Sequence, residues 1–405
     1  MEAQPSRTSD DPTPVVPRPP WVLLDRLGHC EDRADADAAT VASSRTSTGT
    51  VISVSFRFDA PPATSRLYLR WPFGPNREDS SFAYPRVVAA HDDSVLLQLT
   101  VSSRSIDYFV YKARGARPPS LSLLPRSALT RKAIGILRRR GDGRFDVAEL
   151  RTAGGDGTPW EVRRVKVLDG RDKDLALQCW ETDAVVPVGG RFLCWVDYYR
   201  GILVGRVLAD GGSALTYVPL PVDTPWAEPD HGRECPEASR SVCVTAGDTV
   251  KFVSVDRGLV FVFTVTIWTP GKARDGGMEW EKDGEFRAAE LWAFSGYERL
   301  PRVPPEYPVV SMVDPDALCF MVSAGRHAGV DAGGDDTVWL VEVDTRRRAV
   351  RSVSRYSKEE TRDISGRAFH DDEEEEDDTD GLASLNMFHG HAFLPSEVTA
   401  HVHEQ

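Results

Sequence analysis

Hydrophobic and polar residues alternate along much of the chain, and the pattern is clearest just after Thr50. The apolar residues of the segment 51–58 fall on one face of an extended chain, namely Ile52, Val54, Phe56 and Phe58. Successive side chains of a β-strand point to opposite faces of its sheet, so this segment is predicted to be a half-buried strand. The segment 66–71 alternates in the same way beyond two prolines at 61–62, and it is the expected partner strand.

The same arrangement recurs along the chain: a short apolar strand, a turn that contains Asp or Gly, and a second apolar strand. Five further hairpins are expected, at 87–101, 133–150, 192–208, 242–255 and 309–322. Additional strands are expected at 106–113, 215–221, 337–343 and 348–356. The segment 258–268 is rich in β-branched and aromatic residues, which is typical of a buried strand. By contrast, 269–277 is expected to be a loop.

The hairpins begin roughly 45 to 70 residues apart, which is close to the roughly 40 to 50 residues of a propeller blade once long loops are allowed. Counting the hairpin after Thr50, about six units of short antiparallel strands result. We therefore expect an all-β chain with a β-propeller-like fold of about six blades. A pair of β-sandwich domains is the alternative, because the Trp-Asp and Gly-Gly signatures of the common propeller repeats are missing.

Composition shifts suggest four regions. Residues 1–18 are rich in Pro, Ser, Thr and Asp and are expected to form a disordered leader. The propeller-like domain is expected to span 19–356, and the acidic segment 357–386 is expected to be a flexible loop or linker. Residues 387–405 begin with strand-like alternation and are expected to form a closing strand and tail.

Cysteine usage and the N-terminal sequence favour a soluble protein of the cytoplasm or nucleus. The six cysteines include no C-x-x-C pair and no dense cluster of the kind that staples small secreted domains. The N-terminal segment lacks the apolar core of a secretory signal. The longest apolar stretch, 258–268, is far shorter than the roughly 20 residues of a membrane helix, so no membrane partner is expected.

Charge is unevenly distributed. The net charge is −13, and nine acidic residues with no basic residue lie in 371–380, so the rest of the chain is close to balanced. Basic clusters occur at 131–140 and 345–351 and could contact phosphate. The balanced body argues against a nucleic-acid-binding protein, so both clusters are interpreted as solvated turns.

Motifs that would mark an enzyme or a cofactor site are missing. The sequence contains no G-x-x-x-x-G-K-[ST], no strand-flanked G-x-G-x-x-G, no G-x-S-x-G and no H-E-x-x-H. Two histidine pairs have the spacing that places both rings on one face of a strand, where they could ligate a metal: His389 with His391, and His401 with His403. Packing or solvated histidines are the preferred interpretation, so we expect no metal, no cofactor and no assembled catalytic residues.

The segment 193–204 offers the best candidate binding residues. Its two apolar strands flank Asp197, Tyr198, Tyr199 and Arg200. Asp197 suits a turn, and the three residues after it would lie at the tip of the hairpin. Exposed Tyr and Arg are favoured at binding hot spots, although packing at the end of a blade is the simpler role for them.

Several stretches resemble a plant, mostly grass, family that is defined by domain of unknown function 1618 (DUF1618). The matching stretches are 19–26, 65–72, 107–125, 193–204, 217–222, 241–255 and 307–320. The resemblance implies a propeller-like domain akin to those that accompany F-boxes in plants, with no established activity. The F-box itself is missing, because 21–27 is not followed by a helical continuation of that motif.

These observations favour a non-enzymatic module that binds a protein or peptide partner, since propellers present a rigid ring of loops. The alternative is a hydrolase-type enzyme with its site in the propeller channel. Convergence of carboxylates or histidines in a closed pocket would favour the enzyme, and an open channel lined by mixed residues would favour the binding module. The sequence does not indicate the oligomeric state.

Overall fold

The computed structural model describes residues 17–30, 37–72, 85–102, 105–114, 117–125, 133–139, 144–150, 166–167, 180–206, 214–222, 235–258, 262–272, 278–323, 337–356 and 393–402. Within these residues the chain is all-β, as expected, and consists of several small sheets that are mostly antiparallel. A single five-residue helix, α2 (Ala288–Trp292), is described, and the sequence pattern did not predict it. The rest of the described chain consists of strands, short 3-10 turns and loops.

The described strands form six sheets. The first sheet has the order β2-β3-β4-β1-β24, with β2 (Ala42–Arg45), β3 (Val51–Arg57), β4 (Thr64–Arg70), β1 (Val22–Asp25) and β24 (Phe393–Ser396). The second is β5 (Arg86–His91), β6 (Ser94–Ser102), β7 (Ser105–Arg114) and β8 (Arg117–Leu123). The third is the hairpin of β9 (Ile134–Arg138) and β10 (Phe145–Glu149).

The remaining sheets follow in chain order. The fourth has the order β11-β15-β14-β13-β12, with β11 (Lys166–Val167), β15 (Ala214–Pro219), β14 (Gly201–Arg206), β13 (Phe192–Asp197) and β12 (Ala184–Val188). The fifth is β16 (Arg240–Thr245), β17 (Thr249–Arg257), β18 (Phe263–Lys272) and β19 (Met278–Arg287). The sixth is β20 (Glu306–Val310), β21 (Ala317–Ser323), β22 (Val338–Asp344) and β23 (Ala349–Tyr356).

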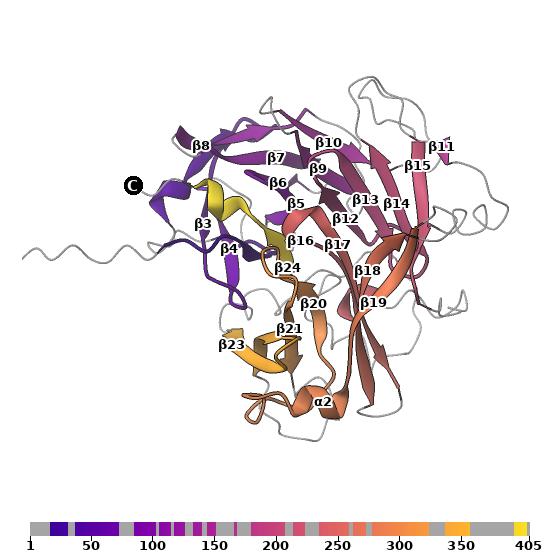
Figure 1. Cartoon of the computed structure of the whole chain (residues 1–405). Helices are drawn as coiled ribbons and strands as arrows, with labels where there is room; N and C mark the ends of the chain where they lie inside the picture. The colour runs from indigo at the N-terminus through magenta and orange to yellow at the C-terminus, as the bar shows by residue number, and fades with distance from the viewer. Residues whose placement is uncertain are drawn as a thin grey trace, which may run out of the picture.

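One edge strand of each sheet faces the middle of the molecule. These strands contact one another in succession: β24 contacts β5, β5 contacts β9, β9 contacts β12, β12 contacts β16, and β16 contacts β20. The succession closes where the ring of Tyr307 on β20 lies 6.5 Å from the ring of Phe393 on β24. Figure 1 shows β24 in the middle of the molecule, with β5, β16 and β20 around it.

The two ends of the chain meet in the first sheet. β24 pairs with β1 in antiparallel register, from Val22 opposite Ser396 to Asp25 opposite Phe393. The sixth sheet is tied to the same place, because the Tyr356 hydroxyl donates a hydrogen bond of 2.6 Å to Asp25. Burial is the main influence on the Asp25 carboxyl and raises its pKa above the usual value. The first and last strands are thus held together next to the central edge strands.

The hydrophobic core consists of clusters that lie between neighbouring sheets. One cluster joins the first sheet to the second, as where the ring of Phe56 packs edge-on against that of Tyr111 at 4.8 Å. Others join the second to the third, the third to the fourth, the fourth to the fifth and the fifth to the sixth. Gly135 shows how closely neighbours approach, because a Cβ atom there would lie 2.4 Å from Val185 of the next sheet.

The strand predictions are largely confirmed. Each predicted hairpin is present, and β3 buries the apolar face that the alternation indicated, with Phe56 fully buried. The prediction of a loop at 269–277 is wrong in its first part, because β18 continues to Lys272 and pairs with β19 there. The hairpin extends beyond the core because Pro270 and Trp280 continue the register, and the Trp280 indole donates to the carbonyl of Pro219.

Several predictions fall on residues outside the described part of the chain. These are most of the leader at 1–18, the acidic segment 357–386, and His389, His391 and His403. No helix among the described residues is long and apolar enough to cross a membrane.

Candidate functional site

A cavity of about 550 Å³ lies where the six central edge strands meet. Residues of β5, β9, β12, β16, β20 and β24 all line it, so every sheet contributes to its wall. A volume of this size is within the range of pockets that hold small molecules or a few residues of a peptide. The cavity is therefore the candidate functional site.

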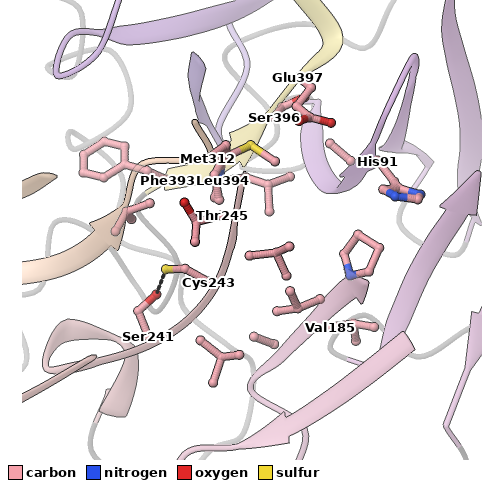
Figure 2. Close-up of a pocket in the computed structure, with 18 of the residues that line it drawn as sticks. His91, Val185, Ser241, Cys243, Thr245, Met312, Phe393, Leu394, Ser396 and Glu397 are labelled. Atoms are coloured by element: carbon pink, nitrogen blue, oxygen red, sulfur yellow. Dashed lines mark hydrogen bonds between the residues drawn. The ribbon is translucent and has the colours of Figure 1, made fainter. Parts of the chain in front are cut away.

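The wall of the cavity is partly apolar. Figure 2 shows Val185 of β12 on one side and Cys243 and Thr245 of β16 on the other, with Met312 and Leu394 near the top. Apolar residues that line the cavity come from five of the described sheets: Ala90, Ala184, Val185, Val186, Val242, Val244, Val309, Phe393 and Leu394. Such a wall can take an apolar part of a ligand, and polar groups at its margins would orient that ligand.

At one part of the wall the charged groups already have partners in the protein. The Nε atom of Arg138 lies 2.8 Å from an Asp93 carboxylate oxygen and forms an ion pair with it. The N–H bond does not point at that oxygen, so the contact is not a hydrogen bond. The backbone N–H of Arg138 donates to His91 Nδ1 at 2.8 Å. Nearby, His401 lies 2.5 Å from Asp92. The pKa of His401 is raised, chiefly by its hydrogen bond to Asp92, and the pKa of Asp92 is lowered by the same bond.

Arg26 lines the cavity directly after β1, and its guanidinium has no carboxylate in ion-pair contact among the described residues. One terminal nitrogen donates to the carbonyl of Val88 at 2.8 Å, and the buried Nε has no hydrogen-bond partner in the described chain. The pKa of Arg26 is lowered to about 10, chiefly by burial and also by Arg86, whereas Tyr198 and Glu237 act in the opposite direction. This cation is thus poorly compensated by the protein.

Arg240, the first residue of β16, is the second such cation. One of its terminal nitrogens donates to the carbonyl of Tyr198 at 2.6 Å, and the guanidinium lies 5.7 Å from the centre of the Tyr199 ring. No carboxylate of the described chain lies at ion-pair distance from it. Burial lowers its pKa, against a weaker opposing effect from Asp256. Arg26, Arg240 and Tyr198 all line the cavity, and Tyr198 is an electrostatic neighbour of Arg26.

Of the two roles considered for Tyr198, the structure shows packing and not exposure at the hairpin tip. The side chain is only 4% exposed and packs in the core cluster between the fourth and fifth sheets. Its hydroxyl accepts a hydrogen bond from the backbone N–H of Val242 at 3.2 Å, and burial raises its pKa. Tyr198 lies in this position because the turn after β13 faces β16 and not the solvent.

The other predicted binding residues shape the same turn. Asp197 is fully buried and accepts hydrogen bonds from the backbone of Glu181 and Tyr199 and from the Arg200 guanidinium at 2.9 Å. Tyr199 and Arg200 are half-buried. Gly201 is required here by close packing, since a Cβ atom would lie 2.5 Å from the carbonyl of Val218. Of the four residues, only Tyr198 lines the cavity. Whether they bind a partner stays a prediction.

The thiol at the cavity is not poised as a nucleophile. Cys243 is buried, contacts the Ser241 hydroxyl at 3.2 Å and accepts from the N–H of Val310. Burial raises its pKa, whereas a reactive cysteine requires a lowered pKa. The described residues also contain no group of three or more His, Cys, Asp and Glu that could hold a metal.

The two basic clusters identified from the sequence are paired where they are described. In the cluster at 345–351, Arg351 contacts both Asp314 and Asp344 at 2.6 Å. Its neighbours Arg346 and Arg348 face Asp316 and Glu290. In the cluster at 131–140, Arg139 pairs with Asp146 across the β9–β10 hairpin. These arginines therefore have carboxylate partners within the described chain.

Sequence reasoning missed Arg26 and Arg240 because neither belongs to a cluster of basic residues. Their only signal is position: Arg26 follows the buried strand VLLD, and Arg240 precedes the buried strand that includes Val242 and Cys243. A charged residue at the end of a buried strand is common in any β protein, so the sequence could not separate these two arginines from the other basic residues.

The comparisons with known proteins concern the second half of the described fold. No curated protein matches the chain. The segment 195–319 extends from β13 to β21 and includes Tyr198 and Arg240. This segment matches the model of DUF1618, a family described as proteins of unknown function, and the match supports the resemblance that the sequence suggested.

Proposed function

We propose that the chain is a six-bladed, β-propeller-like binding module whose central cavity holds part of a protein or peptide partner. The single observation that carries this proposal is the cavity, to which every described sheet contributes an edge strand. In a propeller the blades surround one central channel, whereas each half of a paired sandwich would enclose its own core. The succession of interfaces between neighbouring sheets supports the propeller in the same way.

The lining supports binding over hydrolysis. Its charged groups are mixed in sign: Arg26, Arg138 and Arg240 are positive, and Asp92, Glu237, Asp248 and Glu397 are negative. The buried thiol has a raised pKa, which disfavours covalent catalysis by that group. A mixed, partly apolar wall is the arrangement that we expected of a binding module, and no particular observation favours the hydrolase. We further propose a plant origin and a cytoplasmic or nuclear location.

The experiment is crosslinking from the cavity in the native tissue. A photoreactive residue is placed at Ala246, which is exposed and lines the cavity, and in a matched variant at Ala60, which is exposed in the turn between β3 and β4. The proposal expects the same partner to be crosslinked from Ala246 and not from Ala60. In addition, Ala246→Trp should block recovery of that partner, and Ala60→Trp should not.

Recovery of the partner at full yield by Ala246→Trp would overturn the proposed use of the cavity. Equal crosslinking from Ala246 and Ala60 would likewise place the partner on the outside of the molecule. Turnover of a substrate by the wild-type chain, abolished by Ala246→Trp, would favour the hydrolase instead.

A further inference from the structure

Two arginines that have no ion-pair partner among the described residues line one cavity. Arg26 follows β1 of the first sheet and Arg240 begins β16 of the fifth; Tyr198 is an electrostatic neighbour of Arg26, and its carbonyl accepts a hydrogen bond from Arg240. Among the described residues, each donates hydrogen bonds only to backbone carbonyls, and the buried Nε of Arg26 has none. An unpaired buried charge is costly, so proteins usually pair it or use it to bind a charged ligand.

We propose that Arg26 and Arg240 together bind a carboxylate of a peptide ligand at the Tyr198 side of the central cavity. This inference rests on the proposed function and names the chemistry of its ligand. A guanidinium offers several N–H donors in a planar fork that matches the two oxygens of a carboxylate. The terminal N–H groups of both residues that do not donate to backbone carbonyls are the donors proposed for such bonds, whereas the Nε of Arg26 is buried within the protein.

The surrounding charges favour a singly charged anion. Glu237 is an electrostatic neighbour of Arg26, and Asp248 and Glu397 also line the cavity. These carboxylates would repel a phosphate that carries close to two negative charges more strongly than a carboxylate that carries one. Glu237 opposes the charge of Arg26, to which Arg86 adds, and Asp256 and Asp183 oppose the charge of Arg240. With these neighbours, one additional negative charge is easier to accommodate than two.

The apolar wall indicates what the carboxylate is attached to. Val242 and Val309 line the cavity on the neighbouring strands β16 and β20, and Phe393 and Leu394 continue the wall on β24. An apolar side chain beside the acidic group would fit this surface. A peptide can supply the carboxylate from a Glu or Asp side chain or from its C-terminus, and the chemistry at the two arginines is the same in both cases.

The test measures binding of three short peptides to the full chain by isothermal titration calorimetry. One is a blocked leucine–glutamate–leucine peptide, which offers only a side-chain carboxylate. The second is an acetylated trileucine with a free C-terminus, and the third is a blocked leucine–glutamine–leucine peptide without a carboxylate. At least one acidic peptide should bind about tenfold or more tightly than the neutral one, a ratio that corresponds to about 1.4 kcal/mol. Which acidic peptide binds distinguishes the two sources.

The matched variants remove guanidinium groups inside and outside the cavity. Arg26→Met with Arg240→Met should reduce the affinity for the acidic peptide to that of the neutral one, and each single variant should cause part of this loss. Arg45→Met is the control, because Arg45 is exposed on β2, the strand at the far edge of its sheet. The double variant should melt no lower than the wild type, since methionine removes an unpaired buried charge and keeps much of the apolar stem. The melt therefore shows that any lost binding is not unfolding.

Three results would overturn the inference. They are equal affinity for the neutral and acidic peptides, unchanged acidic-peptide affinity in the folded double variant, and tighter binding of inorganic phosphate than of either acidic peptide. Failure of all peptides to bind would overturn it as well. Suppose that a partner is crosslinked from Ala246 and is still recovered by the Arg26→Met and Arg240→Met double variant. The proposed function would then stand, and only the proposed recognition of a carboxylate would be overturned. If the chain that keeps both arginines gives no crosslinked partner from Ala246, the proposed function itself is overturned.

Discussion

The arginines of the 345–351 cluster and the two arginines of the cavity differ in what the protein gives them as partners. Arg351 is held by two carboxylates, Asp314 and Asp344, each at 2.6 Å. Arg26 and Arg240 are both half-buried, yet in the described chain each donates hydrogen bonds only to carbonyl groups. Clustering of basic residues in the sequence therefore does not identify an arginine that is available to bind a ligand. The presence or absence of a carboxylate partner in space is the informative property.

The pKa values point the same way. The pKa of Asp344 is lowered although burial opposes this, because the backbone N–H of Arg347 and the Arg351 guanidinium stabilise its charged form. The pKa of Arg351 is raised in turn by the two carboxylates, again against the effect of burial. For Arg26 and Arg240, burial is the largest effect and it lowers the pKa. The charge of Arg351 is compensated by carboxylates in direct contact, whereas Arg26 and Arg240 have only more distant carboxylates, such as Glu237 and Asp256.

The largest effect is expected at the residue beside the two unpaired arginines. Tyr198→Ala should lower the free energy of unfolding by about 3 to 5 kcal/mol, because a buried aromatic side chain leaves a cavity when it is truncated. Tyr198→Phe should cost about 1 kcal/mol through the lost hydrogen bond from Val242. Chemical denaturation measures both.

Tyr199→Ala is the matched control for this change, because Tyr199 is half-buried, and it should cost less than Tyr198→Ala. A Tyr198→Ala protein as stable as the wild type would mean that Tyr198 is an exposed tip residue after all. The two unpaired arginines would then lie on a surface and not at a cavity wall.

The next effect tests the contrast between paired and unpaired arginines directly. Arg351→Met should destabilise the chain by about 1 to 2 kcal/mol, because Asp344 would be left with less compensation, although partial exposure of the pair limits the loss. Arg26→Met should cause no loss of stability, or a small gain. In thermal melts of the two variants, the melting temperature should therefore fall for Arg351→Met and stay the same or rise slightly for Arg26→Met. Equal destabilisation would show that Arg26 has a stabilising partner.

A smaller effect is expected from the paired part of the cavity wall. The pKa of His401 is raised in the folded chain, chiefly by its bond to Asp92, so its contribution is fully present below the ordinary histidine pKa of 6.5. That contribution is lost as the pH rises through the raised pKa. Because the side chains of His401 and Asp92 are 37% and 39% exposed, solvent limits it to about 0.5 kcal/mol.

His401→Gln should remove this dependence on pH. The difference in unfolding free energy between wild type and variant should shrink from pH 6 towards alkaline pH, and added salt should reduce it. Asp92 has a lowered pKa, so its own contribution is lost only as the pH falls through that lowered value. A difference that grows with pH would contradict the pairing of His401 with Asp92.

The smallest effect concerns the acidic run at 371–380. Its deletion should leave the melting temperature within about a degree or two, because like charges at this density repel one another and are not expected to be buried. The deletion also tests whether the carboxylates of this run serve as partners for Arg26 and Arg240. A much larger fall would show that the run docks on a basic surface, and the cavity arginines would be the first residues to test for that contact.

Much of the local structure could be predicted from the sequence. The alternation at Ile52, Val54 and Phe56 indicated β3 and its buried face, and it did so because the period of two is a local property of an extended chain. The same reasoning failed at Tyr198. A turn between two apolar strands is usually exposed, and only the neighbouring sheet, through Val242, determines that this tyrosine is covered.

The sequence by itself determined that this chain is built of short, mostly antiparallel strands, and roughly where their hairpins lie. The packing of the sheets was needed to show that edge strands of all six described sheets line one cavity. It also showed that Arg26 and Arg240 both lie in its wall, with no carboxylate at ion-pair distance among the described residues. The physical reason is the range of each interaction. Strand alternation depends on neighbours in the chain, whereas the compensation of a charge depends on groups that are far apart in sequence and are brought together only when the sheets pack.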